Sequence, residues 1–372
     1  MSTFVEKMLG APAGSPARIT PDLIVVNDGI CHTAVEMANL VRSPDKVRVI
    51  FDHDVPTGRP EAARVFGSIR RFARENNVRF IQAEGVGYQY LLEQEVRPGQ
   101  IVVQGGSHAG IYGSVGALGI NVSATELARV LEHDYYNTVV PETVAVRVEG
   151  TLPEHVTMMD AAMAFLSENP CLAGKAVEFC GPQLTAHQKA VLCSMACETG
   201  AFTAAVTDTE DRDLVLDLSR VVPMVTMPCS ARELQKDAVR QPLAVLAGMR
   251  LQAGQIGGYT GGTIEELRLA VSLIEGKTLA RGFRLTVAPA TSADFLKALD
   301  EGIIERFIDF GAQISAVGDH SVVTQGAGVI GKGEKLLTTG LYTYAGCMGV
   351  QDSEVYTGSV PSVMAAAVTG RL

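Results

Sequence analysis

Short runs of apolar, β-branched residues recur along the chain and alternate with segments of helical spacing. Strands are predicted at residues 23–26, 47–51, 78–83, 101–104, 202–206, 284–289 and 312–316. Such continuous apolar runs are typical of strands that are buried on both faces of a parallel sheet. Ser123 with Glu126, and Thr263 with Glu266, match the capping box that begins a helix. The pattern therefore predicts an α/β fold with helices on both faces of a largely parallel sheet.

The strength of this periodicity divides the chain into three regions. It is clear over residues 1–206 and again over 256–372, and it is weaker over 207–255. We therefore expect a first α/β region at 1–206, a connecting region at 207–255 and a second α/β region at 256–372.

Polar residues follow four successive strands at the point where each strand ends. They are Asn27-Asp28, Asp52-His53, Glu84 and Ser107-His108. Ligands of open parallel sheets bind at the carboxyl ends of the strands, so these four loops are expected at one rim. Asp and Asn also favour ordinary turns, which is the alternative interpretation of any one loop taken alone. Four such loops together favour a shared active site.

The glycine-rich stretch at 104–119 is the most distinctive local feature of the first region. It lacks the Gly-Lys-Ser/Thr of a phosphate loop and does not match the dinucleotide-binding pattern. We therefore expect its glycines to let the backbone pass close to a ligand or to another segment.

Composition and charge exclude several classes of function. The 372 residues carry a net charge of −10, which argues against a nucleic-acid binder because such a protein needs a basic surface. No apolar run approaches the roughly 18 residues of a membrane-spanning helix, and the first residues lack the apolar stretch of a secretory signal. We therefore expect a cytoplasmic protein that binds neither nucleic acid nor membrane.

The seven cysteines are scattered along the chain and form no disulfide framework. Cys193 and Cys197 are four residues apart on a predicted helix, so they share one face. We expect them to be buried thiols, since free cysteine packs like a small apolar residue.

Several segments resemble the large subunits of isopropylmalate dehydratase and homoaconitase, in the aconitase superfamily. They are TPDLIVVNDG, VIFDHDVP, GSHAGIYGSVGALG, GKAVEFCGP, GGTIEELRLAVSLIEGKTLARGFRLTVAPAT and SEVYTGSVPSVMAAAVTGR. The resemblance implies a three-layer α/β/α fold with two related halves around a cleft and without the swivelling domain. It also implies a lyase or isomerase that acts on a small organic acid, with a separate small swivel-type subunit as partner.

The cysteines that hold a four-iron, four-sulfur cluster in this superfamily are replaced here. Tyr259 stands at the first ligand position, and Asp319 and Val322 stand at the other two. Because such a cluster needs thiolates, this departure from the family pattern leads us to expect a protein without the cluster and without another cofactor, a divalent metal being the alternative. The family arginine at the position of Thr263 is also missing, which implies a substrate with fewer carboxylates.

The resemblance and the strand-end loops together define the expected site. The expected catalytic residues are Asp52, His53, Ser107, His108, Asp319 and His320. The expected substrate-binding residues are Asn27, Asp28, Glu84, Tyr88, Glu178, Tyr259 and Thr260. An imidazole titrates near neutral pH, so His53 and His108 are the expected proton donors, oriented by Asp52 and Ser107.

Two alternatives to a cluster-free lyase stay open. One is a non-catalytic binding or scaffolding homologue that keeps the fold alone. The other is a hydro-lyase that depends on a single divalent metal ion, held by His53, His108, Asp319 and His320. No ligand-spacing motif such as HxxxH accompanies these residues, which favours hydrogen-bonded histidines over metal ligands.

Overall fold

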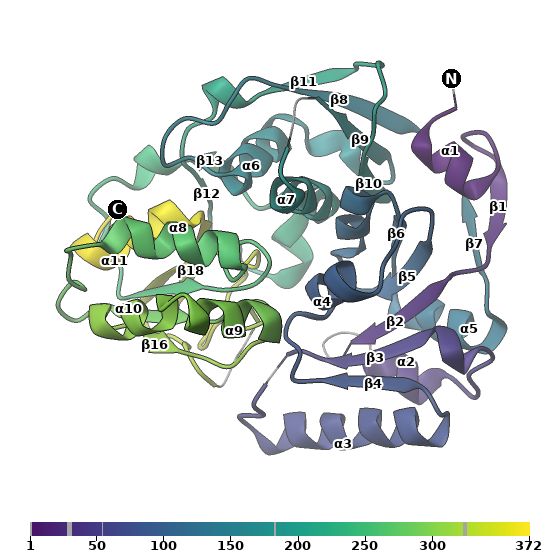
Figure 1. The fold of residues 1–372 in the computed structure, drawn as a ribbon, viewed down its shortest axis with the longest axis horizontal. Coiled ribbons are helices and arrows are strands. Elements are labelled where there is room, and N and C mark those ends of the chain that lie inside the picture. Colours follow the sequence, from purple (N-terminus) through teal and green to yellow (C-terminus); the bar gives the residue numbers. More distant parts are fainter. Residues whose placement is uncertain (1, 28–31, 54, 182–183, 323–325) are drawn as a thin grey trace.

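The computed structural model describes residues 2–27, 32–53, 55–181, 184–322 and 326–372. Within them the chain forms three larger sheets that pack with helices, and a small two-stranded sheet (Figure 1). The α/β fold is confirmed. No helix in these ranges is long and apolar enough to cross a bilayer.

The first large sheet has five parallel strands in the order β4-β3-β2-β5-β6. They are β2 (Leu23–Asn27), β3 (Val47–Phe51), β4 (Arg79–Gln82), β5 (Ile101–Gly105) and β6 (Leu118–Val122). One face packs on α2 (His32–Met37), α3 (Pro60–Glu75) and α5 (Ala124–His133). The other face packs on α4 (Gly87–Gln94) and the 3-10 helix η2 (Ala109–Val115). Alternate residues of β2 enter different cores, which explains its continuous apolar run.

The second large sheet has four parallel strands in the order β10-β9-β8-β11. They are β8 (Thr143–Glu149), β9 (Ala176–Cys180), β10 (Thr203–Val206) and β11 (Leu214–Asp217). It packs on α6 (Met158–Glu168) and α7 (Ala186–Ala196), and shares a core with the first sheet. The small antiparallel sheet joins β1 (Pro16–Ile19) to β7 (Tyr136–Val139), next to α1 (Phe4–Leu9).

The third large sheet has seven strands in the order β13-β12-β18-β17-β14-β15-β16. They are β12 (Met224–Thr226), β13 (Arg240–Pro242), β14 (Ala253–Ile256), β15 (Arg284–Val287), β16 (Gln313–Ile314), β17 (Lys335–Thr338) and β18 (Glu354–Gly358). Only the pairs that involve β12 are antiparallel. Its main core includes α8 (Ile264–Ile274), α10 (Ile303–Phe310) and α11 (Val360–Thr369), with α9 (Ser292–Asp300) beside them.

The segment 207–255 differs from a simple connection between two regions. It supplies β11 to the second sheet and β12, β13 and β14 to the third. These strands have three or four residues each, which is too short to produce a clear period-two pattern. The boundaries near 206 and 256 remain predictions.

The expectation for the glycine-rich stretch is confirmed. A Cβ added to Gly113 would lie 1.8 Å from the carbonyl oxygen of Ala204 on β10, and one on Gly110 would lie 2.5 Å from that of Cys193 on α7. The glycines therefore let η2 pass directly against two neighbouring elements. Cys193 and Cys197 are both buried, as expected.

The two predicted capping boxes have different outcomes. Ser123 and Glu126 form the box at the start of α5. Thr263 begins α8, but its side chain does not cap the helix. Instead, Asp294 accepts a hydrogen bond of 2.9 Å from the Ile264 amide, and Glu266 lies 3.0 Å from His187 Nε2.

Candidate active site

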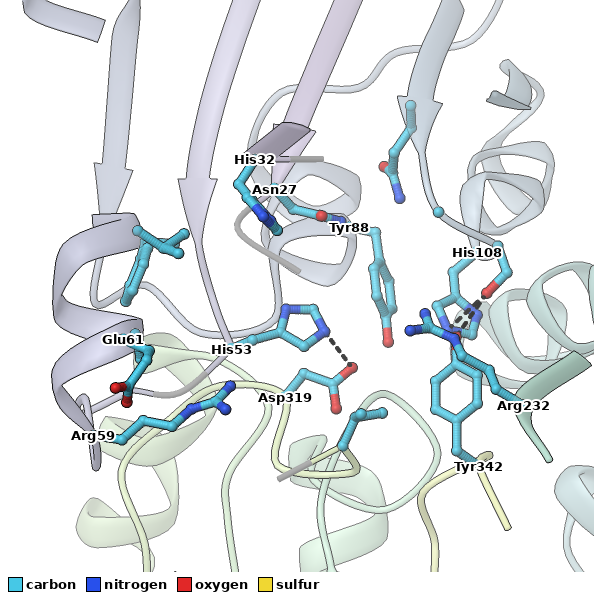
Figure 2. A pocket seen from close by; sticks show the side chains of 17 residues that line it. Asn27, His32, His53, Arg59, Glu61, Tyr88, His108, Arg232, Asp319 and Tyr342 are labelled. Atoms are coloured by element: carbon cyan, nitrogen blue, oxygen red, sulfur yellow. Dashed lines mark hydrogen bonds and ion pairs between the residues drawn. The ribbon is translucent and has the colours of Figure 1, made fainter. Parts of the chain in front are cut away.

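A cavity of about 280 Å³ lies where the carboxyl-end loops of the first sheet meet loops of the third (Figure 2). The labelled side chains that line it are Asn27, His32, His53, Arg59, Glu61, Tyr88, His108, Arg232, Asp319 and Tyr342. Ser107 and Val322 line it as well. The predicted rim of the first sheet is therefore one wall of a real cavity.

Backbone contacts hold the two sides of this cavity together. The Asp319 amide donates to the Asp52 carbonyl oxygen at 2.8 Å, and the Val86 amide donates to that of Ala290 at 2.8 Å. Gly85 has a φ of 102°, and a Cβ there would lie 2.1 Å from the Ala290 carbonyl oxygen. Only glycine satisfies both conditions, so the glycine after Glu84 allows the close approach of the two sheets.

His53 is held by a buried carboxylate on one side of the cavity. Its Nδ1 lies 2.8 Å from Asp52 Oδ1, and the Gly87 amide donates to Asp52 Oδ2 at 2.7 Å. Asp52 is only 2% exposed. His53 Nε2 points to the Asp319 carboxylate, with 4.0 Å between it and Oδ2 (Figure 2). The outer nitrogen of this ring therefore faces the cavity next to a second carboxylate.

His108 has an ion-pair contact with Glu198, a residue that the sequence did not reveal, but the two atoms do not meet the geometry of a hydrogen bond. His108 Nδ1 lies 3.2 Å from Glu198 Oε1, and both side chains are buried. Burial raises the pKa of Glu198, while the positive fields of His108 and Arg240 oppose that rise. The one available signal was a single acidic residue at the end of the apolar stretch 190–197. A buried charge of this kind needs a partner.

Ser107 links His108 to a tyrosine from the third sheet's loops. Ser107 Oγ lies 3.4 Å from His108 Nε2 and 3.1 Å from the Tyr342 hydroxyl. Burial is the largest cause that raises the pKa of Tyr342, and the negative field of Glu198 adds to it. The phenol is therefore neutral at physiological pH. No feature of the sequence pattern singled out Tyr342.

Aromatic rings pack around the same histidine. The His108 ring centroid is 4.9 Å from that of Tyr88 and 5.7 Å from that of Tyr259. Tyr88 lines the cavity, whereas Tyr259 is 2% exposed and packs edge-on against Tyr88 at 5.5 Å. Tyr259 therefore supports the site from behind. Asp319, by contrast, enters the cavity and accepts hydrogen bonds from the Ser321 amide and hydroxyl at 3.0 and 2.5 Å.

Two predicted binding residues, Asn27 and Asp28, follow one another at the end of β2, and the structure describes only the first. Asn27 lines the cavity, and its Nδ2 donates to the Gly105 carbonyl oxygen at 3.4 Å. Asp28 lies outside the residues that the structure describes.

Four other predicted residues do not line the cavity. Glu178 accepts hydrogen bonds from the Phe4 amide at 2.6 Å and the Thr207 hydroxyl at 3.2 Å, which anchors the start of α1. Thr260 donates to the Thr339 carbonyl oxygen at 2.6 Å. The remaining two are Glu84 and His320.

Glu84 and His320 make backbone contacts at the junction of the sheets. The Glu84 carbonyl oxygen accepts a hydrogen bond from the Ser292 amide at 3.1 Å. His320 Nε2 lies 2.8 Å from the Ala316 carbonyl oxygen. These contacts belong to the local loop structure. Neither side chain is part of the cavity wall.

Possible metal ligands are not grouped together in the part of the chain that the structure describes. In the described ranges, no three His, Cys, Asp or Glu side chains are close enough together to hold a metal ion. Of the predicted set, His53 and Asp319 are neighbours, but His320 contacts a backbone carbonyl oxygen. The described free thiols are Cys180, Cys193, Cys197, Cys229 and Cys347, and none of these five lines the cavity.

Two arginines, Arg59 and Arg232, line the cavity. Arg59 immediately precedes α3, and Arg232 begins a 3-10 helix at 232–237. Figure 2 shows their guanidinium groups entering from opposite sides of the cavity. The Arg232 guanidinium carbon lies 6.0 Å from the centroid of the Tyr344 ring. The site therefore has cationic groups that the sequence pattern did not suggest.

Comparison with known proteins agrees with this architecture. The model of the Aconitase family (aconitate hydratase) matches residues 18–214. The homoaconitase large subunit of Thermus thermophilus is 28% identical over 100% of this chain and 96% of its own length. The 3-isopropylmalate dehydratase large subunit of Pyrococcus horikoshii is 29% identical over 100% and 98%.

A solved structure shares the fold. The crystal structure of Thermococcus kodakaraensis aconitase X in its holo-form aligns with a TM-score of 0.57 and 12% identity, covering 99% of this chain and 92% of that one. The family model spans more than half of the sequence, and the relatives align over nearly the whole chain. The chain therefore belongs to the aconitase family.

Proposed function

We propose that the protein is a hydro-lyase that adds or removes water on a small organic acid without an iron–sulfur cluster. One observation carries the proposal: two histidines, each backed by a buried carboxylate, face one cavity. Elimination of water needs one group that accepts a carbon-bound proton and another that protonates the departing oxygen. His53 and His108 supply two such groups.

The carboxylates make each histidine suited to this work. Asp52 and Glu198 contact the Nδ1 atoms of His53 and His108. The Nε2 atoms lie on the cavity side, 4.0 Å from Asp319 Oδ2 and 3.4 Å from Ser107 Oγ. A carboxylate at Nδ1 orients the imidazole ring and stabilises its protonated form. His53 would accept the carbon-bound proton, and His108 would be the source of the proton that reaches the leaving oxygen.

The residues at the former ligand positions support the absence of a cluster. An iron–sulfur cluster would act as a Lewis acid on the substrate hydroxyl if it were bound here. The position that we assign to the first cluster ligand holds the buried aromatic ring of Tyr259. Asp319 and Val322, assigned to the other two ligand positions, line the cavity. Oxygen and hydrocarbon groups do not replace the thiolates that such a cluster needs. The described thiols lie elsewhere, so these residues do not fit the cluster.

Cavity size and charge support a small anionic substrate. A volume of about 280 Å³ lies just below the range of drug-sized ligand pockets. Arg59 and Arg232 line it, and guanidinium groups bind carboxylates through paired hydrogen bonds. We therefore propose a small carboxylic acid with a hydroxyl group next to an acidic C–H bond.

A small subunit is proposed as partner. The names of the similar proteins from Thermus thermophilus and Pyrococcus horikoshii describe each as a large subunit. A second chain that closes over the cavity would exclude water from the reacting groups, which strengthens electrostatic interactions there.

The test is a turnover screen. Hydroxy acids and the corresponding enoates, starting with 2-isopropylmalate, homocitrate and citrate, are incubated with the purified chain, with and without a co-expressed small subunit. Formation or loss of the conjugated double bond is followed by ultraviolet absorbance and mass spectrometry. Turnover that survives anaerobic purification, with iron and sulfide far below stoichiometric amounts, is the expected result.

Three results would contradict parts of this proposal. Stoichiometric iron and acid-labile sulfide would contradict the cluster-free site. Turnover that is abolished by EDTA and restored by a divalent metal would favour the metal-dependent hydro-lyase. Tight binding of acids with no turnover in any combination would favour a non-catalytic homologue.

A further inference from the structure

Tyr342 ends a continuous chain of polar groups that begins deep in the protein. Glu198 lies 3.2 Å from His108 Nδ1, His108 Nε2 lies 3.4 Å from Ser107 Oγ, and Ser107 Oγ lies 3.1 Å from the Tyr342 hydroxyl. Tyr342 comes from a loop of the third sheet, whereas Ser107 and His108 follow β5 of the first. The chain therefore crosses the junction of the two sheets and reaches the cavity at Tyr342.

The chemistry of these groups suits the transfer of a proton. A hydroxyl both donates and accepts, so Ser107 and Tyr342 can each pass a proton on without moving. Burial raises the pKa of Tyr342, so its phenol is a neutral donor at physiological pH. Figure 2 shows Tyr342 and His108 together on one side of the cavity and His53 with Asp319 on the other. A substrate between them would meet a base on one side and a donor on the other.

We propose that the Tyr342 hydroxyl, and not His108 itself, gives the proton to the leaving oxygen of the substrate. The proposal rests on the hydro-lyase function proposed above and names the group that assists the departure of water. The Ser107 hydroxyl and the His108 ring then act behind Tyr342 as its proton supply, with Glu198 as the buried counter-charge.

The step balances in atoms and charge. His53 Nε2 takes the proton from the carbon, the electron pair of that C–H bond forms the double bond, and the C–O bond breaks. The departing oxygen takes the Tyr342 proton and leaves as water. Tyr342 regains a proton from Ser107, Ser107 regains one from His108 Nε2, and His108 ends neutral. The proton gained by His53 returns to solvent before the next cycle and another from solvent restores His108.

The first measurement is nuclear magnetic resonance of the full chain labelled with ¹³Cζ-tyrosine. The resonance of Tyr342 is identified by its loss in Tyr342→Phe. Ser107→Ala should shift this resonance, because it removes the hydrogen-bond partner of the phenol. Tyr344→Phe is the matched control, since its ring lies 6.0 Å from that of Tyr342 without a hydrogen bond to Ser107. An unchanged resonance in Ser107→Ala would overturn the relay.

The second measurement is kinetic, on the hydroxy acid that the wild type turns over. Tyr342→Phe should lower kcat about a hundredfold, the lower end of a general-acid contribution, with KM changed less than about threefold. On the analogue that carries fluorine in place of the hydroxyl, the leaving fluoride needs no proton. The kcat of Tyr342→Phe on this analogue should therefore fall less than about fivefold. The kcat of His53→Ala should fall about a hundredfold on both compounds.

The outcomes separate this inference from the proposed function. An active wild type with an equally active Tyr342→Phe overturns the role of Tyr342 and leaves the hydro-lyase function standing. An equal loss of kcat on the hydroxyl and fluoride compounds also overturns it, because the defect would then be structural. A wild type that turns over no acid in the screen, with or without the small subunit, overturns both.

Discussion

Glu198 Oε1 lies 3.2 Å from His108 Nδ1, whereas Glu178, which the family resemblance favours, anchors the first helix. The two glutamates come from adjacent segments of the chain, but only one contacts a histidine of the cavity. This relationship assigns the two residues different tasks. Glu198 contacts the histidine to which we assign proton transfer, and Glu178 holds the amino-terminal residues in place.

Substitution of these glutamates should separate catalysis from stability. Glu198→Gln keeps the shape but removes the charge behind His108, so kcat should fall at least about tenfold, part of the 10²–10⁴-fold of acid–base catalysis. Glu178→Gln should keep kcat within about twofold and lower the midpoint of thermal unfolding, because the Phe4 amide loses a charged acceptor. Steady-state kinetics and thermal melts measure both. Equal kcat losses in the two variants would contradict the assignment.

Substitution of His53 and of its neighbour Asp319 should lower kcat as much as substitution near His108 does. His53→Ala and Asp319→Ala should each lower kcat on the order of a hundredfold, since both side chains face the cavity where protons move. The exposed His133→Ala on α5 is the control and should keep wild-type activity. Steady-state assays measure turnover, and circular dichroism spectra establish that each variant folds. Wild-type turnover in both cavity variants would refute the proposed chemistry.

The buried thiols should be inert in the native protein. Burial raises the pKa of Cys197 and of Cys347 to about 12, so at pH 8 only about one in ten thousand would be a thiolate. Among the five thiols that the structure describes, Cys229 is partly exposed and should be alkylated first. Iodoacetamide labelling with peptide mass spectrometry, in buffer and in denaturant, measures each site. Rapid native labelling of Cys197 would mean that α7 opens readily.

Close backbone packing predicts a large effect at one glycine and a small one at another. Gly113→Ala places a Cβ 1.8 Å from the Ala204 carbonyl oxygen, so the free energy of unfolding should fall by about 3 kcal/mol or more. Gly67→Ala lies inside α3 with nothing within 4 Å of the new methyl group, so it should stabilise by up to about 1 kcal/mol. Denaturant unfolding compares them, and a neutral Gly113→Ala would contradict the packing of η2.

One buried carboxyl group predicts a pH dependence of stability. Asp160 is 0% exposed, and burial raises its pKa above the ordinary value of 3.8. The native state thus keeps this proton to higher pH than the unfolded chain does. Its stabilising contribution is complete below the ordinary pKa and is lost as the pH rises through the raised value.

The variant Asp160→Asn tests this dependence. Its amide does not titrate, so the free energy of unfolding of the wild type minus that of the variant should fall as the pH rises from about 4. Denaturant unfolding at several pH values gives the difference. A difference that stays constant, or that grows with pH, would show that hydrogen bonds from the Thr157 and Met224 amides dominate.

The sequence was sufficient for the elements whose signals are local. The strand at Leu23–Asn27 and the helix that begins after Ser123 follow from adjacent residues, because a continuous apolar run and a capping box depend on short-range geometry. The Asp52-His53 and Ser107-His108 pairs were predicted for the same reason. They follow strands directly, and parallel strands end at one edge.

Only the tertiary structure decided which distant groups meet. Glu198 at the end of α7, Tyr342 after β17 and Arg232 after β12 lie far along the chain from the loops they join. Their roles depend on how three sheets pack, which no short pattern encodes. The same holds for the strands of 207–255, which are too short to show a period and gain their stability from neighbours across two sheets. Local sequence determined the strand-end histidines, and packing between sheets determined the partners that make them a site.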